Sequence, residues 1–113
     1  MPKLTLVPAL FLLLSACATT TELSNKNPEI QFSSGKSARD FAACVSTKWG
    51  EKRSSIATNP LPNGYTVSIP AGVAGTDAVA TILESESGSS IKYSERLPSL
   101  SPSWMGEYLK SCQ

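Results

Sequence analysis

Few residues in this chain could carry out acid–base or metal chemistry, because its 113 residues include no histidine. Histidine is the commonest metal ligand and a frequent general base, so neither role is filled in the usual way. A carboxylate pair could act as acid and base only where two groups meet at one site. Asp40 instead fits a helix cap, and Glu84 and Glu86 flank a predicted turn. The other two candidates for such a pair, Asp77 and Glu95, stand alone in the sequence. We therefore predict a protein that is not an enzyme and that holds no metal and no cofactor.

Serine is abundant, but no serine stands in a motif typical of a catalytic nucleophile. A Ser–Lys dyad needs a buried, neutral lysine, whereas Lys48, Lys92 and Lys110 are all predicted to be exposed. The segment Ser34-Gly35-Lys36-Ser37 is similar to the end of a phosphate-binding loop, yet it lacks the upstream glycine and a preceding predicted strand. A capped helix that begins at Ser37 explains the same residues.

Cysteine is the remaining reactive side chain, and Cys17 follows a distinctive segment. Lys3 is the only charged residue before it, and residues 4–14 are apolar except for Thr5. This pattern is typical of a secretory signal peptide, and the apolar run is too short for a membrane-spanning helix, which needs about 20 residues. The segment Leu14-Ser15-Ala16-Cys17 resembles the lipobox of bacterial lipoproteins.

The lipobox resemblance implies cleavage before Cys17 by signal peptidase II, a diacylglyceride thioether on its sulfur, and N-acylation of the new terminus. Each buried CH₂ contributes about 0.8 kcal/mol, so two or three acyl chains anchor a protein effectively permanently. Ala18 stands where an Asp would favour retention in the inner membrane. We therefore expect membrane lipid as the partner of acylated Cys17, at the outer membrane and facing the periplasm. A position facing outward from the cell surface stays open.

The mature chain carries no excess charge that would attract a polyanion. Lys and Arg number 10 and Asp and Glu number 9, and removal of Lys3 with the signal peptide brings the two into balance. Nucleic-acid binding and electrostatic binding to a membrane surface are therefore disfavoured.

The two other cysteines, Cys44 and Cys112, remain once Cys17 is acylated. The oxidising cell envelope favours a disulfide between them. Two free thiols or a bridge between two molecules are the alternatives.

Three segments follow from composition: a lipoprotein signal peptide at 1–16, a lipidated flexible tether at 17–36 and a small domain at 37–113. Residues 18–36 are polar and contain Pro28 and Gly35, as expected for a tether. Ile30 and Phe32 alternate with polar residues, so this stretch could instead add a short strand or dock on the domain.

Two amphipathic helices are predicted to enclose the domain. Ser37 approximates a capping box with the residue three positions on, and Phe41, Val45 and Trp49 then recur at helical spacing. A second helix is expected after Ser101-Pro102, which supplies a cap and a first-turn proline. Its apolar face consists of Trp104, Met105, Tyr108, Leu109 and Cys112.

Three strands are predicted between these helices, around residues 65–69, 78–84 and 91–96, and the last two could form a hairpin. Residues 51–63 contain Asn59-Pro60 and are expected to form a surface connection. The expected fold class is therefore α+β: a three-stranded antiparallel sheet with both helices on one face, joined by the Cys44–Cys112 disulfide.

Aromatic side chains are the main candidates for a binding surface, in particular Trp104, Tyr108 and Tyr93. In so small a domain most aromatic residues are expected in the core. An exposed Trp104 or Tyr108 would indicate an interface on the second helix.

The pattern over residues 37–113 resembles that of small uncharacterised proteobacterial envelope proteins and lipoproteins. The residues that carry it are Phe41-Ala42-Ala43-Cys44 with Trp49, Gly64-Tyr65-Thr66-Val67, Gly88-Ser89 with Tyr93, and the helix ending at Cys112. No activity follows from this resemblance, because none is assigned to those proteins.

These observations together predict a lipid-anchored envelope protein with a non-catalytic binding or structural role, acting through contacts with the envelope or with an envelope protein partner that is unknown. The alternative is a lipoprotein that binds a small ligand or inhibits a hydrolase. Ser87-Gly88-Ser89-Ser90-Ile91-Lys92-Tyr93 is loosely similar to the Ser-Gly-x-x-Tyr loop of membrane-bound lysozyme inhibitors. Here two extra residues separate the glycine from the tyrosine, and those inhibitors are β-barrels without helices. An enzyme ranks third.

Overall fold

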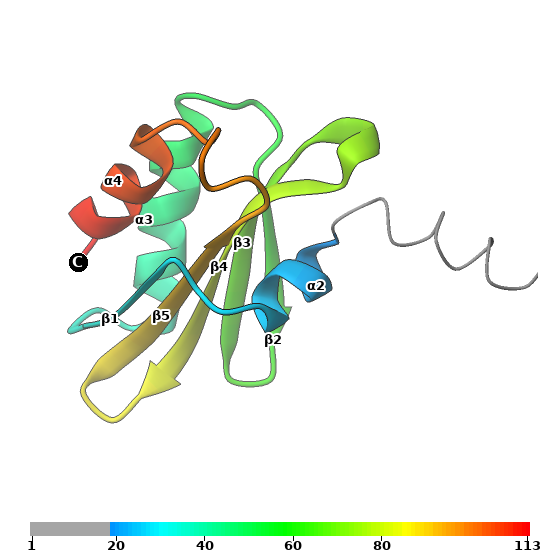
Figure 1. The fold of residues 1–113 in the computed structure, drawn as a ribbon. Coiled ribbons are helices and arrows are strands. Elements are labelled where there is room, and N and C mark those ends of the chain that lie inside the picture. Colours follow the sequence, from blue (N-terminus) through cyan, green and yellow to red (C-terminus); the bar gives the residue numbers. More distant parts are fainter. Residues whose placement is uncertain (1–18) are drawn as a thin grey trace, which may run out of the picture.

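The computed structural model describes residues 19–113 (Figure 1), so the predicted signal peptide and Cys17 lie outside the described residues. The elements along the chain are α2 (Thr20–Asn25), β1 (Ile30–Ser34), α3 (Ala38–Gly50), β2 (Ala57–Leu61), β3 (Gly64–Pro70), the 3₁₀ turn η2 (Gly72–Ala74), β4 (Thr76–Ser85), β5 (Gly88–Glu95) and α4 (Trp104–Ser111). None of the helices within residues 19–113 is both long and apolar enough to cross a membrane.

The strands form one antiparallel sheet with the order β1-β5-β4-β3-β2. Strands β2 to β5 follow one another as hairpins, whereas β1 joins the far side of β5 after α2. The β2–β3 hairpin needs glycine at position 64, because a Cβ there would overlap the backbone carbonyl of Ile82 on β4. Turns therefore set the register of the four-stranded meander, and β1 is added from a distant part of the chain.

One face of the sheet packs against α3 and α4, which lie side by side (Figure 1). Ser37 begins α3 as its side chain accepts a hydrogen bond from the Asp40 amide, as expected for a cap. The fully buried core joins both helices to the strands and consists of Ala38, Phe41, Val45, Trp49, Val67, Ile69, Ala78, Ala80, Ile82, Ile91, Tyr93, Leu109 and Cys112. Each large apolar side chain buried there contributes about 1.5–3 kcal/mol.

The opposite face of the sheet is partly covered by α2 (Figure 1). Thr19 and Glu22 form a capping box at its start, and Leu23 is buried beneath it. The Thr20 Oγ1 atom lies 3.0 Å from Thr76 Oγ1, and Lys26 Nζ donates to the carbonyl of Glu95 at 2.6 Å. The helix is therefore fixed to β4 and β5 at both of its ends.

The expected three-stranded sheet with two helices is wrong, because residues 19–113 form five strands and three helices and are mostly β. Strands β1 and β2 are outermost, so each pairs on one side only and has a weaker sequence pattern than an interior strand. Pro60 marks residues 57–61 as a surface connection in sequence, yet proline is accepted on a sheet edge when its nitrogen faces outward. The structure therefore adds one strand at each edge of the predicted sheet.

The predicted flexible tether also needs correction, because α2 and β1 lie within residues 17–36. The polar composition of this stretch is typical of a linker, but its few apolar residues are placed where they can be buried. Leu23 packs on the sheet, and Ile30 and Phe32 pack against the core. Their alternation was the signal for a strand, and pairing with β5 makes that strand stable.

Candidate interaction site

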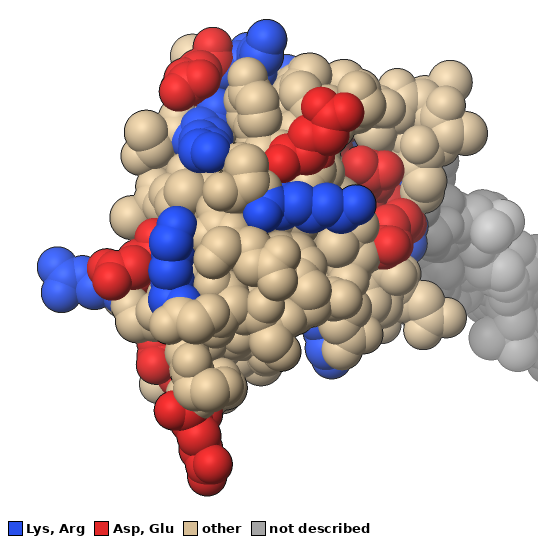
Figure 2. All heavy atoms as spheres, turned by 90° about the vertical axis from the view of Figure 1, so that its left-hand side faces the viewer, with Lys and Arg blue, Asp and Glu red and all other residues tan. Residues whose placement is uncertain are grey.

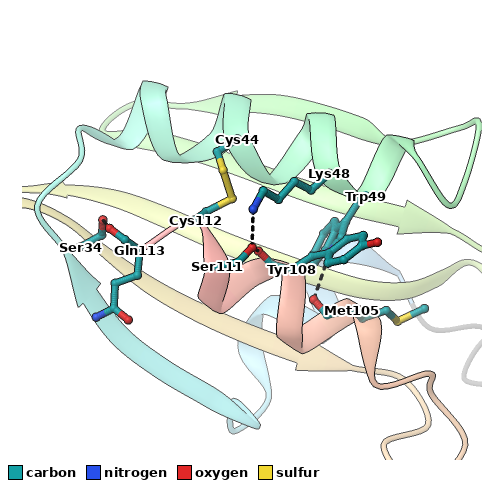
Figure 3. The surroundings of a disulfide bond; sticks show 9 residues. All are labelled: Ser34, Cys44, Lys48, Trp49, Met105, Tyr108, Ser111, Cys112 and Gln113. Atoms are coloured by element: carbon teal, nitrogen blue, oxygen red, sulfur yellow. Dashed lines mark hydrogen bonds between the residues drawn. A yellow bond between two sulfur atoms is a disulfide. The ribbon is translucent and has the colours of Figure 1, made fainter.

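A disulfide between Cys44 and Cys112 joins α3 to the end of α4 (Figure 3), which confirms the predicted bridge within one molecule. The indole of Trp49 donates a hydrogen bond to the carbonyl of Met105 at 3.0 Å. Along the same side of α3, Lys48 Nζ contacts the hydroxyl of Ser111 at 2.6 Å. Three connections thus hold α4 and the cysteine that caps it, and they fix the position of the next residue, Gln113.

Gln113 reaches the outer edge of β1. Its Nε2 atom donates to the carbonyl of Ser33 at 3.1 Å, and its own carbonyl accepts from the hydroxyl of Ser34 at 3.3 Å. The carbonyl of Ser33 therefore points away from β5. Alternate residues of an antiparallel strand turn their backbone groups the same way, so the N–H and C=O of Gln31 also face this outer edge.

A groove of about 370 Å³ runs along this edge between β1 and the end of α4. We call it the β1 groove; it is lined by Glu29, Ile30, Gln31, Phe32, Lys110 and Gln113. Its lining includes the half-buried Ile30 and Phe32, the outward backbone groups of Gln31, and one exposed acidic and one exposed basic residue. This combination suits an extended polypeptide, which can add backbone hydrogen bonds to a strand while its side chains fill alternate positions.

The opposite edge of the sheet, at β2, is less suited to such pairing. Leu61 and Gly64 pair on either side of a two-residue turn, so the residue before Leu61 turns its backbone groups outward. That residue is Pro60, which has no N–H to donate. Proteins commonly protect edge strands in this way, whereas no proline occurs within β1.

A second groove of about 400 Å³ lies between α3 and strands β2 and β3. Its lining consists of Arg39, Ala42, Ala43, Ser46, Thr47, Thr58 and Tyr65, so Arg39 is the one charged residue among them. The lining lacks a carboxylate with which Arg39 could form an acid–base pair. The second groove therefore offers fewer charged groups than the β1 groove, which is lined by Glu29 and Lys110.

The three aromatic residues predicted to form a binding surface occupy two different places. Trp104 and Tyr108 are half-buried on α4, and their ring centroids lie 5.9 Å apart. Tyr93 is instead fully buried, with its ring 5.9 Å from that of Trp49. Trp104 and Tyr108 are thus the two of the three that reach the surface.

The hydroxyl of Tyr93 donates a hydrogen bond to Glu95 Oε2 at 2.6 Å. Burial, and then the neighbouring Glu95 carboxylate, raise the pKa of Tyr93 far above its ordinary value. The phenol is therefore a neutral core donor. In the segment that is similar to the lysozyme-inhibitor loop, the tyrosine is consequently not available to a hydrolase.

The scattered carboxylates have structural partners. Asp77 lies between Arg96 at 2.7 Å and Arg53 at 3.3 Å. Glu84 accepts a hydrogen bond from the Ala38 amide, so its carboxylate occupies the start of α3. A strand does precede Ser34-Gly35-Lys36-Ser37, yet an anion there would meet this carboxylate. Within residues 19–113, no group of three His, Cys, Asp or Glu residues could hold a metal ion.

Charged side chains are mixed over the side of the molecule that carries α3 and α4. Lys and Arg residues are interspersed there with Asp and Glu residues (Figure 2), so this face has no broad patch of a single sign. Local geometry, rather than a strong electric field, distinguishes the β1 groove from its surroundings.

The β1 groove was missed in the sequence, although the alternation of Ile30 and Phe32 pointed to its strand. The groove also requires the end of α4, and residues 29–32 and 110–113 are brought together only by the tertiary fold. No family model, curated protein or solved structure matches this chain. Functional inference therefore rests on its own residues and geometry.

Proposed function

We propose that this chain is a non-catalytic lipoprotein of the bacterial outer membrane, anchored by acylated Cys17 and facing the periplasm. The observation that carries the anchor is the segment Leu14-Ser15-Ala16-Cys17 directly after a short apolar run. Its support comes from the sequence, and a disulfide in the domain accords with an oxidising compartment.

The anchored domain acts by binding an extended polypeptide segment of an envelope partner in the β1 groove. The support is the outward backbone of Gln31, the apolar Ile30 and Phe32 beside it, and the exposed Lys110 in the same lining. The disulfide-linked α4 forms the second wall, so the groove is largely preformed. Preformed sites lose less conformational entropy on binding.

Intact mass measurement of the membrane-extracted protein tests the anchor. The expected mass is that of residues 17–113 plus acyl chains, with a gain of two hydrogens when the disulfide is reduced. The variant C17S is the control, because a serine hydroxyl cannot form the thioether. A wild-type mass without acyl chains would refute the anchor.

Binding is tested by selecting ligands for the immobilised protein from a phage-displayed library of random linear peptides. Selected peptides should perturb the amide resonances of Gln31 and Ser33, and Q31P should abolish their binding because it removes an outward donor. The matched control is T58P, since Thr58 has the same outward orientation on β2 as Pro60. A library without binders, or binders equally affected by T58P, would refute the β1 groove as the site.

A further inference from the structure

Exposed apolar side chains gather in two loops at one end of the sheet. Val73 is 97% exposed in the loop between β3 and β4, and Leu100 and Leu97 are 76% and 43% exposed in the loop between β5 and α4. Gly72 and Gly75 have positive φ angles of 61° and 95° and turn the first loop sharply on either side of Val73. The loop thereby presents an apolar residue at its tip.

The two loops meet at the start of β4. The amide of Arg96 donates to the carbonyl of Asp77 at 2.8 Å, and their side chains form an ion pair at 2.7 Å. Leu97 and Leu100 line a small cavity of about 150 Å³ together with Asp77. Val73 lies on the same side, since it precedes β4 by three residues. The three apolar residues therefore lie in the two loops at this end of the sheet.

The start of α2 lies beside the start of β4. Thr20, the first residue of α2, lies with its hydroxyl 3.0 Å from that of Thr76. Cys17 is three residues earlier, and an extended chain advances at most about 3.6 Å per residue. A stretch of three residues therefore spans at most roughly 11 Å. Figure 1 shows the start of α2 and the η2 loop at the same end of the sheet.

We infer that this end of the domain rests on the membrane, with Val73, Leu97 and Leu100 entering the interfacial region of the bilayer. The inference depends on the proposed acylation of Cys17, because the acyl chains bring the lipid surface to the start of α2. The pairing of Asp77 with Arg53 and Arg96 compensates its charge near that surface. The hairpin turns at the other end of the sheet then face away from the membrane.

Lipid quenching of introduced tryptophans tests this orientation. Lipidated full-length V73W is reconstituted into vesicles of phosphatidylethanolamine and phosphatidylglycerol that contain phosphatidylcholine brominated on its acyl chains. The added emission of V73W should be blue-shifted and lost to the bromolipid. The matched control is L61W: Leu61 is also an exposed apolar residue, at 36%, but it flanks the β2–β3 turn at the opposite end. Its added emission should be unquenched.

Each outcome decides the inference. Quenching of V73W alone supports it, and near-UV circular dichroism of each variant shows whether the fold is retained. Should V73W be misfolded, L100W replaces it with the same expectation. Unquenched emission from a protein that floats with the vesicles and carries acyl chains overturns the orientation while leaving the anchor intact. Equal quenching of V73W and L61W also overturns it, and a mass without acyl chains overturns both proposals.

Discussion

Removing the disulfide should cost this domain a large part of its stability. The Cys44–Cys112 bridge spans a sequence separation of 68 residues. Closing a loop of this length restricts the unfolded chain enough to stabilise the fold by about 4 kcal/mol in the chain-entropy treatment. A domain of this size has about 5–14 kcal/mol of total stability, so the bridge accounts for roughly a third or more of it.

The perturbation is the double variant C44A/C112A, which avoids leaving one unpaired thiol in the core. Urea unfolding followed by the fluorescence of the fully buried Trp49 should show the free energy of unfolding lowered by about 4 kcal/mol. The melting temperature should fall by about 15–30 °C. Wild-type protein unfolded with a reductant is the control, since it loses the same crosslink without a substitution.

Agreement between the double variant and the reduced wild type would assign the loss to the crosslink. A double variant within about 1 kcal/mol of the oxidised wild type would refute the reasoning, because so small a loss is within the range that residual structure in the unfolded state can produce. A much larger loss in C44A/C112A than in the reduced protein would instead show that the two sulfur atoms stabilise the core by packing.

Three further predictions concern the core. G64A should lower the free energy of unfolding by about 2 kcal/mol or more, because the added Cβ has no room beside β4. Its control is G50A, which should be neutral or stabilising in the same urea assay, because no atom lies within 4 Å of a Cβ added there. W49F should lower the free energy of unfolding by about 1–3 kcal/mol, because the buried carbonyl of Met105 loses its hydrogen-bond donor. Urea unfolding of the variant and the wild type at the same pH measures this difference. Burial raises the pKa of Tyr93 in the folded protein, so the phenol proton is lost from the unfolded chain at a lower pH than from the folded one. The free energy of unfolding should therefore fall as pH rises above about 10. Urea titrations across this pH should show a smaller dependence for Y93F, and an unchanged dependence would contradict the assignment.

The helices α3 and α4 could be predicted from the sequence because their signals are local, and the disulfide could be predicted because few cysteines are present. The helical spacing of Phe41, Val45 and Trp49 does not depend on partners elsewhere, and the two cysteines had few alternatives. The interior strands β3, β4 and β5 were also recognisable from their apolar residues. The edge strands were not, since β1 and β2 have short and interrupted patterns that become strands only beside β5 and β3.

The candidate site depends on contacts between distant residues, which explains why its prediction was incomplete. Trp104 and Tyr108 lie together because both are on one helix, a local relation that the sequence can show. Tyr93 was grouped with them by residue type alone, and its position on the core side of β5 follows from a register that only the folded sheet determines. The β1 groove joins residues 29–32 to residues 110–113 and has no local motif.

The disulfide and the β1 groove are physically linked, because the bridge holds the helix that forms one wall of the groove. Gln113 directly follows Cys112 and donates to the carbonyl of Ser33 on the outer edge of β1. Reduction of the disulfide would leave α4 held by the hydrogen bonds of Trp49 and Lys48. The contact between Gln113 and Ser33 would then no longer be held in place by a covalent bond. An exposed edge strand can pair with other chains and promote aggregation. The oxidising compartment that we propose for this chain would therefore affect more than stability, because the disulfide also holds the helix that lies beside β1.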